Sequence, residues 1–125
     1  MSDGLKDALN CCNIKSSNVE LVEGTKYDAN KPRMDLLPTN PLVDIAKVLT
    51  HGASKYQPHN WRKGIAYSRV YAALQRHLSA WNNGQDLDPE SKENHLAHAG
   101  CCLMFLLEYT HSRPEFDDRY KGEDK

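Results

Sequence analysis

The sequence lacks the long apolar run that membrane insertion or secretion requires. No stretch approaches the roughly 20 apolar residues of a membrane-spanning helix, and the first residues, MSDGLKDALNCC, contain no apolar core of a secretion signal. The net charge is only −1 over 125 residues, so the chain as a whole has no attraction for a membrane surface or for nucleic acid. We therefore expect a cytoplasmic, single-domain protein with no membrane partner.

Cysteine spacing of the zinc or redox type is also absent. The four cysteines form two adjacent pairs, Cys11–Cys12 and Cys101–Cys102, and neither pair has CxxC spacing. The second pair lies in an apolar segment, where reduced cysteine acts as a packing residue. This usage fits a reducing cytoplasm.

The alternation of apolar and polar residues that marks a β-strand is missing throughout, which predicts an all-α fold. Residues 41–56, 67–82 and 88–111 instead carry helical patterns, and short links join them. We predict a compact helical bundle of these three main helices. Around it we expect a flexible N-terminal arm (residues 1–24), an extended loop (residues 25–38) that opens the domain of residues 25–111, and a charged C-terminal tail (residues 112–125).

The helix predicted over residues 88–111 is the centre of the bundle. Asp88 and Pro89 are typical of a helix start, as a side-chain cap and a first-turn proline. After the first two turns, only His98 and Glu108 are plainly polar as far as Tyr109. A helix that is apolar almost all round must be covered on several sides. We expect a dimer or a tetramer to complete this cover, built partly on Ala97, Gly100, Cys101 and Met104.

Acidic residues are missing between Ile45 and Gln85. A random scatter of the 17 acids would place about five or six in these 41 residues, which instead hold six Lys or Arg residues and three histidines. Four acids then follow close together: Asp86, Asp88, Glu90 and Glu93. Cations gather to bind anions, and clustered carboxylates hold hard metal ions, so this division of charge favours a nucleotide with metal-bridged phosphates. The alternative is that the basic residues form the solvated faces of two helices.

Nucleic acid, the other common polyanion, fits the sequence less well. The basic stretch has few aromatic residues for base stacking, and the sequence has no helix-turn-helix or OB-type pattern. We therefore expect a small nucleotide ligand and no nucleic-acid partner.

Four sequence blocks carry a resemblance to a known family: GTKYDANKPRMDLLP, LTHGASKYQPHNWRKG, YAALQRHLSAW and DLDPESKENHLAHAGCCLMFLLE. In this order, over roughly residues 24–109, they resemble the phage and prophage dATP/dGTP diphosphohydrolases, small α-helical proteins grouped with the MazG-like nucleotide pyrophosphohydrolases. The resemblance implies hydrolysis of a deoxypurine triphosphate to the monophosphate and pyrophosphate with Mg²⁺ or Mn²⁺. For a phage-encoded protein, the compartment would be the host cytoplasm.

The resemblance does not supply the metal ligands. MazG-type enzymes place them as ExxE on one helix and ExxD on the next, whereas residues 67–82 contain no acid. The metal site must therefore be argued from the residues of this chain.

We expect the metal ion to bind near the start of the central helix. His95 and His98, three residues apart, share one helix face there, and Asp88 and Glu90 stand one turn earlier with hard oxygen ligands. The expected metal ligands are Asp88, Glu90, His95 and His98. Two simpler interpretations stay open, namely Asp88 and Glu90 as helix-capping residues and His98 as a core histidine.

The expected catalytic residues are Arg76, His77, Glu90 and His95. His77 lies at the edge of the apolar face of its helix and would contact His95 if that helix packs antiparallel to the central one. Arg76 can clamp phosphate oxygens in the transition state through its planar guanidinium. Its alternative role is a surface ion pair.

Substrate-binding residues are expected in the loops and in the first helix: Lys31, Arg33, His51, Lys55, Asn60, Trp61 and Arg62. Lys31 and Arg33 stand in a stiff proline-containing loop, which can bind phosphates at little ordering cost. Trp61 can stack on a purine or anchor the core. Asn60 can read a base edge or simply form a turn.

Two classes of function stay open on this basis. The first is a metal-dependent hydrolase that cuts the α–β phosphoanhydride. The second is a non-catalytic protein that binds and sequesters a nucleotide or a nucleotide-derived signal. Metal dependence separates them, because only the hydrolase needs Mg²⁺ or Mn²⁺ for turnover.

Overall fold

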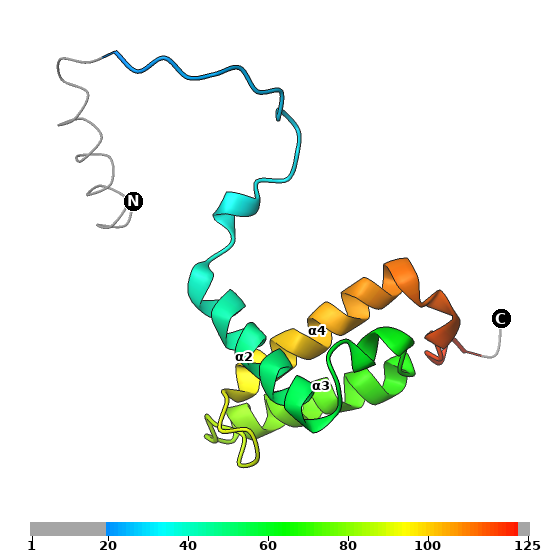
Figure 1. The fold of residues 1–125 in the computed structure, drawn as a ribbon. Helices are drawn as coiled ribbons and strands as arrows, with labels where there is room; N and C mark the ends of the chain where they lie inside the picture. Colours follow the sequence, from blue (N-terminus) through cyan, green and yellow to red (C-terminus); the bar gives the residue numbers. More distant parts are fainter. Residues whose placement is uncertain (1–19, 123–125) are drawn as a thin grey trace. The chain divides into compact units, whose positions relative to one another are not determined.

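A computed structural model describes residues 20–122 of the chain. The structure has three α-helices, α2 (Thr39–Lys55), α3 (Tyr67–Asn82) and α4 (His95–Ser112) (Figure 1). Short 3-10 helices precede α2 (Met34–Leu36), lie between α2 and α3 (Asn60–Lys63) and follow α4 (Pro114–Phe116). The described residues contain no β-strand, only an isolated bridge between Leu87 and Asn94. The predicted all-α fold with three main helices is confirmed. Within the same residues, no helix is long and apolar enough to cross a membrane.

The described residues divide into two units, residues 20–33 and residues 34–122. The first unit is an exposed, extended segment whose only regular feature is a turn, in which the Lys31 N–H donates to the Asp28 carbonyl and Asn30 has a φ of 70°. The expected arm of residues 1–24 and the Cys11–Cys12 pair fall mostly on residues 1–19, which lie outside the described residues.

Helices α3 and α4 run side by side in opposite directions and enclose the main core (Figure 1). Tyr67 at the start of α3 stacks on Tyr109 near the end of α4, and the Tyr67 hydroxyl donates to the Tyr109 carbonyl over 2.9 Å. Tyr109 is fully buried, and its own hydroxyl donates to the Trp61 carbonyl over 2.6 Å. These bonds fix the 3-10 helix at Asn60–Lys63 against the pair of helices.

Helix α2 packs across the first half of α4. Val48 of α2 is buried together with Ala97 and Cys101 of α4, and a Cβ added at Gly100 would lie only 3.0 Å from Ile45. The small residues of α4 therefore let α2 approach closely within one subunit. The expectation that Ala97 and Cys101 form a subunit contact is wrong, because α2 already covers them.

The second cysteine pair has the packing role expected for it. Cys101 is buried and Cys102 is half-buried, and both are unpaired thiols. Burial raises the pKa of the Cys101 thiol to about 12, so it is neutral at physiological pH.

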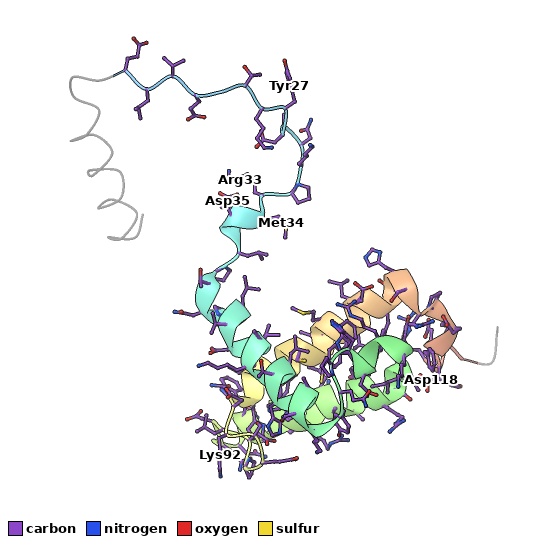
Figure 2. All side chains as sticks on the ribbon, viewed as in Figure 1. Tyr27, Arg33, Met34, Asp35, Lys92 and Asp118 are labelled. Carbon is purple, nitrogen blue, oxygen red and sulfur yellow. The ribbon has the colours of Figure 1, made fainter. Side chains whose placement is uncertain are left out.

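The central helix begins at His95, seven residues later than the sequence signal at Asp88 predicts. Asp88 does cap backbone N–H groups, but those of Glu90 and Ser91 in a tight turn. Lys92 then has a left-handed φ of 64°, which a right-handed helix does not tolerate. Asn94 is the actual N-cap, accepting from the Leu96 N–H over 2.7 Å. Figure 2 labels Lys92 on this loop between α3 and α4.

Part of the charged C-terminal segment belongs to the folded unit. Gly64 has a φ of 104°, and the Phe116 ring lies where a Cβ of residue 64 would stand. Asp118 accepts hydrogen bonds from the backbone N–H and the hydroxyl of Ser68, in the first turn of α3 (Figure 2). The carboxylate thus supplies the capping acceptor that α3 lacks at its own N-cap residue, Ala66.

Candidate active site

Three potential metal ligands converge where α3, α4 and the intervening loop meet. They are His77 on α3, Asp88 in the loop turn and His95 at the start of α4, and their ligand atoms all lie within 4.8 Å of one another. We call them the His77–Asp88–His95 triad. The Nδ1 atoms of His77 and His95 are 2.9 Å apart, which confirms the predicted contact across the antiparallel helices. His95 is buried, and the other two residues are half-buried.

A glutamine sets the orientation of the His95 ring. The Nε2 atom of His95 lies 2.9 Å from Oε1 of Gln85, which is an acceptor. With Nε2 as the donor of this hydrogen bond, the Nδ1 atom of a neutral His95 carries the lone pair. His77 then donates through its own Nδ1 in the 2.9 Å contact. Transfer of that proton to the other ring nitrogen of His77, Nε2, would leave a lone pair on the Nδ1 atom of each histidine for a metal ion. A hydrogen-bonding partner such as Gln85 is usual for a metal-binding histidine.

The surroundings favour the protonation states that metal ligands need. The pKa of His77 is lowered, first by burial and then by the neighbouring His98 and His95. Burial also lowers the pKa of His98, although the nearby Asp88 charge opposes this. For Asp88, burial disfavours the carboxylate, but hydrogen bonds from the Ser91 and Glu90 N–H groups outweigh it and lower the pKa. A neutral His77, a neutral His98 and an ionised Asp88 are therefore favoured at neutral pH.

These shifts predict that acid destabilises the fold in the histidine range. Both histidines protonate near pH 6.5 in the unfolded chain and at lower pH in the folded one. Between these values the unfolded state binds more protons, so the free energy of unfolding should fall as pH drops from 7.5 to 5.5. Denaturant titrations across this range, with a chelator present, would measure it. The double variant His77→Gln, His98→Gln should show a flatter dependence; an equally steep one would contradict the assignment.

His98 supports the triad. Its ring stacks on that of His77 with a centroid distance of 4.4 Å, and its Nε2 lies 2.7 Å from the Ser91 hydroxyl. Ser91 also donates to Asp88, so one hydroxyl links the stacked rings to the carboxylate. Of the four expected ligands, the structure brings Asp88 and His95 together with His77 and places His98 against the His77 ring.

Glu90, the fourth expected ligand, is paired with a lysine. Its Oε1 accepts from Lys55 Nζ over 2.8 Å, and both side chains are largely exposed. This hydrogen bond lowers the pKa of Glu90 and raises that of Lys55. The carboxylate of Glu90 is not part of the triad. Its hydrogen bond instead holds the Lys55 ammonium beside the triad.

A cavity of about 700 Å³ adjoins the triad. It is lined by α2, the segment that follows it, α3, the Asp88 turn and α4. The predicted site residues that line it are His51, Lys55, Asn60, Trp61, Arg76, His77, Asp88, Glu90 and His98. Segments far apart in the sequence thus bring most of the predicted residues to one concave surface, of the size usual for small-molecule sites.

Trp61 lines this cavity and packs against Phe105 and the Arg62 guanidinium. The Trp61 indole stacks on Phe105 with centroids 4.4 Å apart, and the Arg62 guanidinium lies 4.7 Å from the indole centre. Trp61 therefore has the core-anchoring role that was one of its two interpretations. Arg62 does not line the cavity; its Nε donates to His59 Nδ1 over 2.9 Å. Lys31 and Arg33 belong to the first unit, residues 20–33.

Two polar residues of the site were missed by the sequence analysis. Gln85 follows the turn after α3 and has no periodic or motif signal that would link it to His95. Ser91 stands three residues after Asp88, which is a usual spacing for a capped turn. That spacing could have indicated its bond to Asp88, but not its contact with His98.

Comparisons with known proteins point to one family. Residues 22–119 match the family described as "dATP/dGTP diphosphohydrolase, N-terminal". Over 96 residues the chain is 34% identical to a protein of Salmonella phage PMBT28 named dATP/dGTP diphosphohydrolase. The alignment covers 77% of this chain and 33% of that protein, so the chain spans about a third of the relative's length. No solved structure matches.

Proposed function

The chain belongs to the dATP/dGTP diphosphohydrolase family, and from this membership we propose that it hydrolyses a deoxypurine nucleoside triphosphate to the monophosphate and pyrophosphate. The observation that carries the proposal is the convergence of His77, Asp88 and His95 beside a cavity that also holds Lys55 and Arg76. Potential metal ligands and the basic side chains that can bind a triphosphate thus lie at the same cavity. In an infected host cytoplasm, this activity would adjust the nucleotide pool.

The triad fits a divalent metal ion. Two imidazole nitrogens and one carboxylate oxygen suit Mn²⁺ better than Mg²⁺, because Mg²⁺ prefers oxygen ligands and retains its waters. We therefore propose Mn²⁺ as the more effective ion and Mg²⁺ as the weaker alternative. Such an ion, when bound, neutralises negative charge on the phosphate oxygens and activates water. Asp88 and the Nδ1 atoms of His77 and His95 would hold it, with Gln85 and Ser91 fixing the ligands.

The cations of the cavity have separate roles in this proposal. Lys55 binds the phosphate chain as a point charge, and Glu90 positions it when no phosphate is present. Arg76 stands next to His77 and lines the same cavity, where its guanidinium binds two oxygens of the phosphoryl group. We assign Glu90 to the positioning of Lys55, and not to the metal.

Product analysis tests the proposed reaction. The protein would be incubated with deoxynucleoside and ribonucleoside triphosphates and with Mn²⁺, Mg²⁺ or a chelator, and the products would be separated. We expect monophosphate and pyrophosphate from dGTP and dATP with a divalent ion only. Recovery of intact nucleotide bound to the protein in the chelator as well as with Mn²⁺ would instead favour the sequestering function.

We also propose self-association, through an exposed face of α4 that keeps Met104 from the contact first expected but not Ala97 and Cys101, which α2 covers. Four large apolar side chains of α4 are exposed, Leu96, Leu103, Met104 and Leu107, with exposed fractions from 39 to 66%. A second copy would cover them. We expect a dimer or tetramer by sedimentation at micromolar concentration, and a monomer for Leu103→Glu with Leu107→Glu. Leu37→Glu, exposed outside α4, is the control. A monomeric wild-type protein would contradict the proposal.

A further inference from the structure

The cavity contains an aromatic ring that the protein leaves largely uncovered. Tyr56, at the C-terminal end of α2, lines the cavity and is 61% exposed. The other two large aromatic residues of the lining, Trp61 and Phe105, are half-buried and stack on each other. Of the cavity's larger aromatic rings, Tyr56 is therefore the one most accessible to a ligand.

A series of contacts connects Tyr56 to the triad in a definite order. The Lys55 ammonium lies 5.4 Å from the centre of the Tyr56 ring and 2.8 Å from the Glu90 carboxylate. The Glu90 backbone N–H in turn donates to Asp88 over 2.9 Å. The order is thus aromatic ring, cation and triad carboxylate, which matches the order of base, phosphates and metal ion in a metal-bound nucleotide.

Two polar residues whose side chains suit a base edge also line the cavity. Gln57 directly follows Tyr56, and Asn60 is held by a hydrogen bond from its N–H to the Gln57 carbonyl over 3.2 Å. Each side-chain amide has both a donor and an acceptor, and can therefore pair with the edge of either purine.

We propose that Tyr56 is the base-stacking platform of this site and that the purine of the substrate lies on its ring, while Lys55 binds the phosphates. The inference rests on the proposed function, since it takes a purine nucleotide as the ligand. It transfers the stacking role first considered for Trp61 to a tyrosine that is largely exposed. Stacking on an aromatic side chain contributes about 1–3 kcal/mol per base, or roughly a five- to 150-fold effect on Kd.

Binding of a non-hydrolysable α,β-methylene analogue of dGTP in the presence of Mn²⁺ tests the proposal. Tyr56→Leu should raise the Kd of the analogue about tenfold or more. It should leave the Kd of inorganic tripolyphosphate unchanged, because that ligand has no base. Tyr56→Trp should bind the analogue at least as tightly as the wild type. Tyr71→Leu, an exposed tyrosine on α3 outside this cavity, should change neither Kd.

Three results would overturn the proposal: an unchanged Kd in Tyr56→Leu, an equal loss for tripolyphosphate, or no binding of the analogue to the wild type. Circular dichroism of each variant would verify that the helix content is retained. The binding assay requires no turnover, so the two proposals can fail separately. If the protein forms products but Tyr56→Leu binds the analogue as tightly as the wild type, only the stacking proposal fails. If binding depends on Tyr56 but no products form, only the proposed hydrolysis fails.

Discussion

Asp88→Asn is expected to lower the turnover of dGTP and dATP by more than about 100-fold while leaving the fold intact. Removing even a residue that only orients a metal ligand commonly costs 10–100-fold, and Asp88 supplies the one negative charge of the triad. The hydrogen bonds that shape the turn go to Oδ1, from the N–H groups of Glu90 and Ser91. An asparagine oxygen can accept the same bonds. The substitution therefore removes the charge and keeps the turn.

Steady-state turnover with Mn²⁺ and the melting temperature of each variant would check this prediction. Glu93→Gln is the matched control, since it removes a neighbouring acid that lies outside the cavity and the triad. It should keep a rate close to that of the wild type. Wild-type turnover in Asp88→Asn, in a folded protein, would place the metal site elsewhere.

Arg76→Met should produce the second large loss, of about 100-fold or more in kcat. A planar guanidinium binds two phosphoryl oxygens at once, and arginines that neutralise charge in phosphoryl-transfer transition states contribute about 10³–10⁵ in kcat. We expect a smaller effect than this range here, because Arg76 is exposed and water can replace part of its effect. The binding of nucleoside without phosphates should not change.

Arg69→Met is the control for this variant. Arg69 lies two turns earlier on α3, is also exposed, and does not line the cavity beside the triad. Its replacement tests whether loss of any cation on this helix lowers the rate. Equal losses for the two variants would show that Arg76 acts only through the general positive field, as a surface cation and not as a clamp.

The sequence predicted a helix well where its start and stop signals agree with its apolar periodicity. α3 was predicted from Tyr67 to Asn82, which are its bounds in the structure, because an apolar face of period 3.6 is followed by the Asn-Gly stop. The start of α4 was predicted wrongly, because an Asp followed by Pro caps a helix or a turn with the same chemistry. Only the left-handed backbone of Lys92 and the competing cap at Asn94 decide between the two.

Prediction of the site depended on how far each contact reaches along the chain. The contact of His77 with His95 followed from antiparallel packing of two well-defined helices and was correct. The contact of Lys55 with Glu90 spans 35 residues and depends on the path of the Asp88 turn. No periodicity encodes that path, so the contact of Glu90 with Lys55 was not predicted. Gln85 was missed for the same reason, since its position depends on the fold of the loop.

The most direct test of the proposed metal site is a Mn²⁺ titration that follows the occupancy of the site and the turnover in the same sample. Electron paramagnetic resonance would measure bound Mn²⁺, and product separation would measure dGTP hydrolysis. We expect one catalytic Mn²⁺ per chain, with turnover that rises in proportion to its occupancy, and loss of both signals in His77→Gln. Hydrolysis at the wild-type rate in His77→Gln, or turnover that is unaffected by complete removal of divalent ions, would contradict the proposed metal site.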